Sequence, residues 1–137
     1  MGRALGTTAV ILDGVVMAAG ADGRPDAERL QRRLDGASDS AIRRMARSAP
    51  VVYMVFDLLW HEGHPTVDLP YDERRQRLDA LGLHGPAWQT PASHPGQGRA
   101  LLEASATQGL RGVVAKRLTS PYHPGTTSKE WIEVVTG

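Results

Sequence analysis

The amino-acid sequence predicts an α+β fold, or an irregular α/β fold, built as one domain. Apolar runs of strand length lie among helical segments without a regular strand–helix alternation, which is typical of these classes. The run at 51–60 is almost entirely β-branched, aromatic or leucine, and Asp57 is its one charge. Such a run indicates a central strand buried on both faces. The length of 137 residues suffices for one hydrophobic core, but not comfortably for two.

The first half of the chain predicts one strand and two helices before this central strand. Residues 10–19 form the strand, and the Asp-Gly and Pro of 21–25 form a turn. Asp26 caps a helix over 27–34, and Gly36 ends it. Ser38 or Ser40 begins a second short helix over 41–47, whose basic face carries Arg43, Arg44 and Arg47.

The second half predicts two longer helices and three shorter strands. Glycines close both helices, one at Gly82 and the other at Gly109. Trp60, Trp88 and Trp131 lie in predicted strands, where core packing is the expected role. The expected elements are a turn at 61–65, a helix at 71–81, a short strand at 87–90, a helix at 96–108, a strand at 112–118, a polar loop at 119–129 and a last strand at 130–135.

Composition excludes several classes of function. Apolar content of 41% and charged content of 23% are ordinary for a soluble protein, and a net charge of +1 gives no general attraction to nucleic acid or membranes. The chain has no cysteine, which excludes disulfides, thiolate catalysis and cysteine metal sites. No apolar run approaches membrane-spanning length, and Asp13 interrupts the first one. We therefore expect a cytoplasmic protein without a membrane partner.

Several sequence blocks together resemble the adenylation domain of ATP-dependent DNA ligases, most closely the ligase module of bacterial end-joining enzymes. Each block is weak alone, but their order and spacing are similar to those of the family over residues 8–135. The resemblance implies antiparallel sheets flanked by helices, in part of a nucleotidyltransferase fold of the DNA ligase and mRNA capping enzyme type. The blocks are Leu12-Asp-Gly with its Val-Val-Met-Ala tail, Phe56-Asp-Leu-Leu-Trp60, Gly112-Val-Val-Ala-Lys116, Ser120-Pro-Tyr and Trp131-Ile.

The resemblance implies a reaction that uses ATP, Mg²⁺ and nicked double-stranded DNA. A lysine attacks the α-phosphate, AMP passes to a 5′-phosphate, and a 3′-hydroxyl displaces it. The family's lysine stands in a Lys-x-Asp-Gly motif before the first block, and neither Lys116 nor Lys129 stands in one. Arg33-Leu-Asp-Gly36 imitates the motif, but arginine stays protonated and cannot attack phosphorus. We therefore expect residues 1–137 to be a partial adenylation domain that lacks the nucleophile segment and the C-terminal OB domain.

Four positions that carry charge in the family are altered. Val15 stands where a glutamate is expected, and valine cannot bind Mg²⁺. Arg111 replaces a carboxylate, while Glu133 and Val135 replace two lysines. The sequence therefore predicts no catalytic or metal-binding residue, and we conjecture that Arg111 and Glu133 pair with each other.

The resemblance leaves a small set of candidate site residues. Phe56 corresponds to the residue that lies against adenine, and Lys116 to one that touches the α-phosphate. Asp57 and the turn Asp13-Gly14 are also retained, although Asp57 is equally well explained as a partnered structural carboxylate. For DNA the candidates are Arg117, near the end of the predicted strand, and Lys129 in the polar loop, with the face of Arg43, Arg44 and Arg47 as a second surface. Solvated charges are the alternative for both surfaces.

The combined hypothesis is a ligase-like domain linked to DNA repair that does not adenylate itself, that is, a pseudoenzyme. Alternatives are a non-catalytic nucleotide- or DNA-binding domain, one half of a split ligase whose separate chain carries the missing lysine, and a fragment whose N-terminal part is encoded upstream. His61, Glu62 and His64 form a further candidate metal site, with an exposed turn as the alternative. His94 and His123 are expected to be isolated surface residues.

Overall fold

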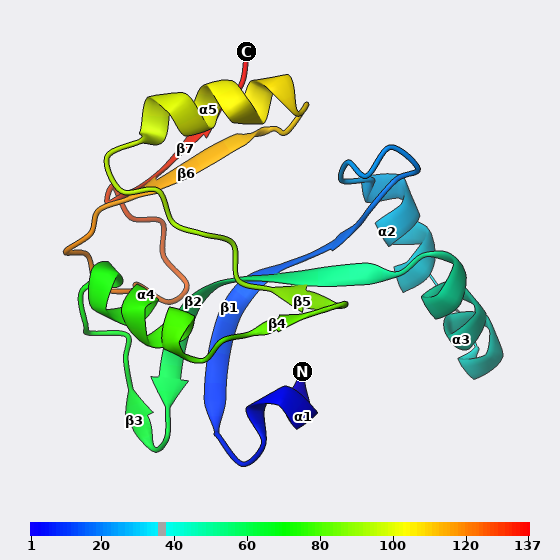
Figure 1. Cartoon of the computed structure of the whole chain (residues 1–137), viewed down its shortest axis with the longest axis horizontal. Helices are drawn as coiled ribbons and strands as arrows, with labels where there is room; N and C mark the ends of the chain where they lie inside the picture. The colour runs from blue at the N-terminus through cyan, green and yellow to red at the C-terminus, as the bar shows by residue number, and fades with distance from the viewer. Residues whose placement is uncertain (36–37) are drawn as a thin grey trace.

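In a computed structural model that describes residues 1–35 and 38–137, helices flank two separate sheets, as the α+β expectation requires (Figure 1). No helix in this described part is long and apolar enough to cross a membrane. The elements are α1 (Gly2–Leu5), β1 (Val10–Ala18), α2 (Ala27–Leu34), α3 (Asp39–Ser48), β2 (Val51–His61), β3 (His64–Pro65), α4 (Tyr71–Ala80), β4 (His84–Gly85), β5 (Trp88–Gln89), α5 (Gly98–Thr107), β6 (Gly112–Lys116) and β7 (Trp131–Val135).

The two sheets are mainly antiparallel. In the first, the strand order is β1-β2-β5-β4, and β3 folds back on β2 as a hairpin. The second consists of β6 and β7, and it places Lys116 opposite Trp131. One pairing departs from the antiparallel expectation, because β2 and β5 run parallel where Tyr53 meets Trp88. This short pairing depends on a long-range contact that no local pattern in the sequence indicates.

The register between β1 and β2 shifts at the position of the candidate site. Asp13 lies opposite Asp57 and Gly14 lies opposite Val55, so Phe56 has no partner on β1. The predicted turn at Asp13-Gly14 is therefore wrong, since both residues belong to a strand with a bulge-like irregularity. A Cβ on Gly14 would lie 2.1 Å from the backbone oxygen of Met54, so glycine allows this close approach.

The hydrophobic core lies between β2 and α4. Val55, Leu58, Leu78 and Leu83 are fully buried and form one cluster. Burying each such side chain contributes about 1.5–3 kcal/mol, so this cluster fixes α4 on the sheet. Trp88 packs partly buried against the cluster, as the core interpretation of the tryptophans predicts.

Capping residues begin the helices α2 and α3 as the sequence predicts. Asp26 accepts a hydrogen bond from the backbone N–H of Arg29 at 2.8 Å. Ser38, rather than Ser40, caps α3, which begins at Asp39 and so earlier than predicted. The predicted stop at Gly36 lies outside the described residues.

The remaining elements follow the prediction closely. The helix expected at 96–108 is α5, with Ser105 buried on its inner face, and α5 lies along β6 (Figure 1). The strand expected at 112–118 ends at 116. The sequence did not indicate α1, β3 or β4, which are four, two and two residues long. Such short elements depend on tertiary packing rather than on a local pattern.

Candidate functional site

A completely buried ion pair joins β2 to α4. Arg74 donates from Nε to Oδ1 of Asp57 at 2.8 Å and from a terminal nitrogen to Oδ2 at 3.0 Å. Both side chains are fully buried, and the backbone N–H of Leu58 adds a third hydrogen bond to Asp57. A buried carboxylate requires such partners, and a bidentate guanidinium supplies the strongest pairing. Asp57 is thus a partnered carboxylate, the structural alternative considered from the sequence.

Arg74 also fastens two loops to this pair. Its other terminal nitrogen donates to the carbonyls of Leu69 at 2.6 Å and Ser120 at 2.9 Å. The hydroxyl of Ser120 in turn donates to the carbonyl of Arg117 at 2.8 Å. One guanidinium therefore connects β2, the start of α4 and the loop before β7.

Lys116 brings the second sheet to the same carboxylate. Its Nζ lies 3.8 Å from Oδ2 of Asp57, and the side chain is 11% exposed. The ammonium lies 3.8 Å from the ring centroid of Trp131 and 5.0 Å from that of Tyr71. Cation–π attraction and the ion pair hold the charge in place of water. Lys116 is therefore seated among aromatic rings, with its charge directed at Asp57.

Burial and charge act in opposite directions on Lys116. Burial lowers the pKa of Lys116 below its ordinary value, whereas the negative charges of Asp57 and Asp13 raise it. Burial also raises the pKa values of Tyr53 and Tyr122, and the charge of Asp13 adds to both shifts. Asp13 thus lies near the cluster from the β1 side.

Two of the three central candidate residues for a nucleotide site lie together, although none of the three lines the cavity described below. Asp57 and Lys116 come together from different sheets. Phe56 is half-buried at the register shift, and in the described part of the chain its ring is not among the groups that contact the charged end of either residue. Arg74 is the residue that the sequence interpretation missed. No pattern in the sequence distinguishes Arg74 from its neighbours Arg75 and Arg77.

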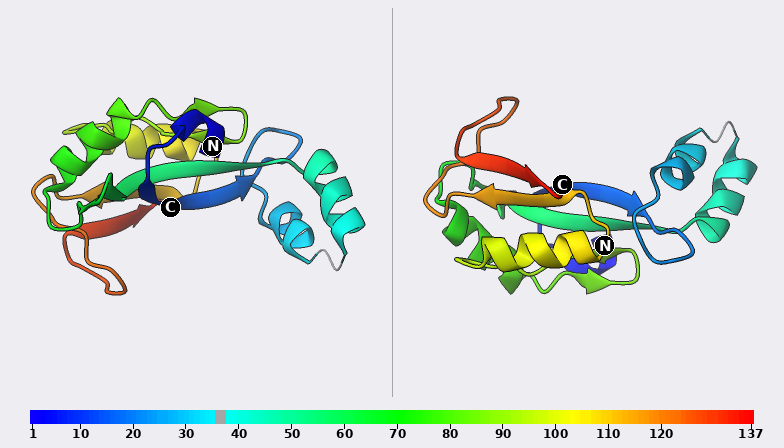
Figure 2. Two further views of the ribbon diagram at one scale, coloured as in Figure 1. Left: turned by 90° about the horizontal axis from the view of Figure 1, so that it is seen from below. Right: turned by 90° about the horizontal axis from the view of Figure 1, so that it is seen from above.

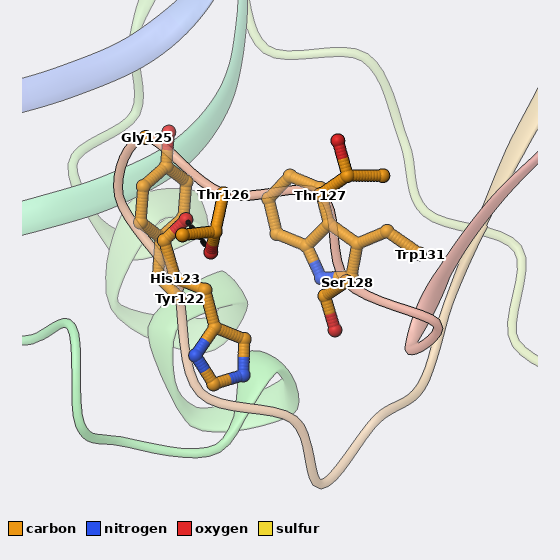
Figure 3. A pocket seen from close by; sticks show the side chains of 7 residues that line it. All are labelled: Tyr122, His123, Gly125, Thr126, Thr127, Ser128 and Trp131. Carbon is orange, nitrogen blue, oxygen red and sulfur yellow. Dashed lines mark hydrogen bonds between the residues drawn. The ribbon is translucent and has the colours of Figure 1, made fainter.

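A cavity of about 380 Å³ is lined in part by Trp131 (Figure 3). The ring of Trp131 also contacts the ammonium of Lys116. The rings of Tyr122 and Trp131 meet edge to face with centroids 5.3 Å apart. Neither Phe56 nor Asp57 lines this cavity. Its wall consists of the rings of Tyr122 and Trp131, together with a histidine, a glycine and three hydroxyl residues: His123, Gly125, Thr126, Thr127 and Ser128.

The two predicted DNA contacts stand at either end of this loop. Arg117 lies 3.8 Å from Glu130, and Lys129 is exposed. The sequence interpretation expected His123 to be isolated, and this is wrong. Its Nε2 lies 3.0 Å from Oε2 of Glu130. Glu130 therefore contacts two cationic or potentially cationic side chains in the same loop.

The conjectured pair between Arg111 and Glu133 is confirmed. Nε of Arg111 lies 3.3 Å from Oε1 of Glu133, and their side chains are 82% and 56% exposed. Arg111 directly precedes β6 at the end of the sheet away from Lys116, and Glu133 lies opposite Val114 in the middle of the strand pair. The two charge reversals thus compensate each other on the surface.

The residues of the candidate metal site form the tight hairpin between β2 and β3. Glu62 has a positive φ of 48° and accepts a hydrogen bond from the backbone N–H of Ala9 at 2.6 Å. Nδ1 of His64 contacts the carbonyl of Glu62 at 3.0 Å. Across the described residues, no group of three or more potential ligands is arranged to hold a metal ion.

Comparisons with known proteins agree with the sequence blocks. A family model described as "ATP dependent DNA ligase domain" matches residues 3–134. A DNA ligase of Methanosphaerula palustris is 38% identical over 130 residues, which is 91% of this chain and 22% of the relative. The multifunctional non-homologous end joining protein LigD of Mycolicibacterium smegmatis is 34% identical over 124 residues, which is 90% of this chain and 15% of the relative.

Solved structures give the same result for the fold. A mycobacterial DNA ligase D complexed with ATP and MES superposes with a TM-score of 0.73 at 28% identity. The match covers 96% of this chain and 40% of that structure. The ligase domain of M. tuberculosis LigD also gives a TM-score of 0.73, with coverage of 97% and 39%. The chain thus spans less than half of each of these proteins.

Proposed function

We propose that this chain, which belongs to the ATP-dependent DNA ligase family, is a ligase-like domain of DNA strand joining that does not adenylate itself. The similarity to an end-joining LigD supports a place in DNA repair. The ion pair between Arg111 and Glu133 carries the proposal. Where the family resemblance implies a carboxylate and a lysine, this chain has the opposite charges, and they satisfy each other.

The lysines support the same conclusion. The chain contains two, and neither stands in a Lys-x-Asp-Gly motif. Lys116 is seated between Asp57 and the rings of Trp131 and Tyr71, so its Nζ is directed at the carboxylate and held between these groups. The exposed Lys129 has no residue pattern that would activate it. Because neither lysine stands in the family motif, we assign the role of nucleophile to neither.

A nucleotide-binding role for the retained residues is part of the proposal. Lys116 is the phosphate contact, and Asp57 positions it through the pair with Arg74. Phe56 is the contact for the adenine ring, and Asp13 borders the site from β1. ATP fits this set because a cation and aromatic surfaces are present. The residues fit Mg²⁺ poorly, since Arg74 occupies the Asp57 carboxylate, so no metal-assisted step is assigned to this chain.

Nicked double-stranded DNA is the proposed macromolecular partner. Arg117 and Lys129 flank the loop of the cavity and supply charge toward a phosphate backbone. Contacts of this type position a duplex without reading its sequence.

One observation favours the alternative in which a separate chain completes the domain. Within the described residues, β1 is an edge strand whose outer side is unpaired. It is nine residues long, and Ile11, Val15 and Val16 on it are exposed. An apolar edge of this length is a template for an added strand. A partner chain that carries the missing lysine would fit there.

Incubation with α-labelled ATP and Mg²⁺ tests the proposal directly. We expect no label to remain on this chain in a denaturing gel, while the Methanosphaerula palustris relative serves as a positive control. A label on this chain that survives alkali and is released by acid, as a phosphorus–nitrogen bond requires, would overturn it. In the split-ligase alternative, the label appears on a second chain, and strand joining requires both.

A further inference from the structure

Two arginines of α2 fasten the end of α3. Arg29 donates to the carbonyl of Ser48, and Arg33 donates to the carbonyl of Ala49 at 2.8 Å. These carbonyls at the end of a helix have no partner within the helix, so a guanidinium is a favourable donor for them. The two helices are therefore held as a unit with a defined orientation.

The arginine face, defined as Arg43, Arg44 and Arg47, is exposed on α3. Within the described part of the chain, none of the three has a carboxylate within 4.0 Å, although Asp39 lies one turn before Arg43. The other exposed arginines divide into two groups: Arg3, Arg32 and Arg99 also have no such carboxylate among the described residues, but they do not form a cluster of three on one helix. Each of the following lies within 4.0 Å of an acidic side chain: Arg24, Arg77, Arg111 and Arg117.

The arginine face is also remote from the rest of the molecule. Both views show α2 and α3 at the end of β1 and β2, away from α4, α5 and the β6–β7 sheet (Figures 1 and 2). Among the described elements, α3 contacts α2, and α2 contacts β1. Three charges that neither pair nor pack internally are thus presented outward on a projecting helix.

We propose that the arginine face binds the phosphate backbone of duplex DNA. Guanidinium groups stay charged and bind phosphate oxygens in a bidentate manner, which suits a backbone contact that is independent of sequence. Arg43 and Arg47 are one helical turn apart, so their side chains rise from the same side of α3. The inference rests on the proposed function for its partner, and it adds a contact surface separate from the loop of Arg117 and Lys129.

An anionic membrane fits this surface less well than DNA. A membrane-surface helix buries a continuous apolar face beside its basic residues. On α3, Met45 and Ala46 are half-buried within the protein, and Ile42 is the one exposed large aliphatic residue of that helix. The remaining surface is therefore basic without a matching apolar face.

The test compares two variants that lose the same charge. One is Arg43→Gln/Arg44→Gln/Arg47→Gln, and its matched control replaces three arginines that have acidic partners: Arg24→Gln, Arg77→Gln and Arg111→Gln. Glutamine keeps helix propensity, and circular dichroism checks the fold of both variants. Binding to a fluorescein-labelled nicked duplex is followed by anisotropy across a KCl series. A second titration uses vesicles that contain phosphatidylserine.

We expect the arginine-face variant to reduce the slope of log affinity against log salt by about 2 to 3 and the control by less than about 1. Equal losses would reduce the inference to a net-charge effect and overturn it. Vesicle binding that depends on these arginines while DNA binding does not would also overturn it, in favour of a membrane partner. The inference would also be overturned if the wild-type chain did not bind the nicked duplex.

The outcome is distinguishable from failure of the proposed function. An Arg117→Gln/Lys129→Gln variant tests the loop separately. If this variant binds the nicked duplex with unchanged affinity, the arginine face remains as the DNA contact. Self-adenylation is measured with labelled ATP in the absence of DNA, so a label on this chain would refute the proposed loss of catalysis without altering the salt slopes.

Discussion

Asp57 and Arg74 form a bidentate ion pair that is completely shielded from water. The carboxylate comes from the central strand, and the guanidinium comes from the helix that covers it. Lys116 approaches the same carboxylate from the second sheet, at 3.8 Å. Asp57 therefore connects two sheets and one helix, which explains why a strand so apolar retains a charge.

Breaking this buried pair is expected to be costly. Arg74→Met leaves the Asp57 carboxylate without its main partner, and we expect a loss of about 3–5 kcal/mol in the free energy of unfolding, measured by urea denaturation. Arg77→Met is the matched control, because Arg77 forms an exposed pair with Glu73, and it should cost less than about 1 kcal/mol. Equal costs for the two variants would show that the buried pair has no special role.

The stability contribution of Lys116 should depend on pH. The pKa of Lys116 in the folded chain lies below the ordinary value of 10.5. At pH values between the folded pKa and 10.5, the unfolded chain therefore binds more protons at this residue than the folded chain does. Stability from this group therefore increases with pH in that interval. We expect the difference in unfolding free energy between the wild type and Lys116→Met to shift in favour of the wild type there. A Lys129→Met control should show no such trend, and a shift in the opposite direction would contradict the buried position of Lys116.

The charges of Arg111 and Glu133 should be exchangeable. Arg111→Glu places two carboxylates side by side, and Glu133→Lys places two cations there, so each single variant should lose a few tenths of a kcal/mol. The double variant restores an attractive pair and should recover that loss. A double-mutant cycle by urea denaturation measures this coupling. Simple additivity of the two losses would mean that the side chains do not interact in solution.

Gly14 should not tolerate a larger residue. A Cβ there meets the Met54 backbone oxygen at 2.1 Å, within the β1–β2 pairing, so the strands must shift. We expect Gly14→Ala to lower the free energy of unfolding by more than about 1 kcal/mol. Gly98→Ala is the control, because a Cβ there meets nothing within 4 Å, and alanine favours the helix α5. A thermal melt that ranks the two variants in the opposite order would refute the close approach.

The sequence predicts the larger elements because each has a local cause. The apolar run of 51–60 becomes β2, and capping by Asp26 begins α2 where expected. Ser38 caps α3, which begins at Asp39 rather than at residue 41. The pair of Arg111 and Glu133 was predictable because one residue replaces a carboxylate of the family pattern with a positive charge and the other replaces a lysine with a negative charge. Patterns of this kind are visible without knowledge of the tertiary structure.

The partner of Asp57 was not predictable in the same way. Three arginines lie close together in α4, and spacing does not reveal which one turns toward β2. Arg75 is also buried, but it pairs with Asp79. Even a correct prediction of which arginines are buried would therefore not have identified Arg74 as the partner of Asp57. The position of Phe56 depends on a register shift between two strands, and sequence alternation does not encode that shift.

Lysine-selective NMR tests the central claim, a retained nucleotide site without self-adenylation, most directly. With ¹³Cε-lysine, the chain gives two side-chain resonances, because Lys116 and Lys129 are its two lysines. On addition of ATP and Mg²⁺, we predict that the Lys116 resonance shifts saturably and returns when ATP is removed, while Lys129 stays in place. A Lys116 resonance that does not respond to ATP, or a permanent new resonance from a phosphoramidate, would contradict the account.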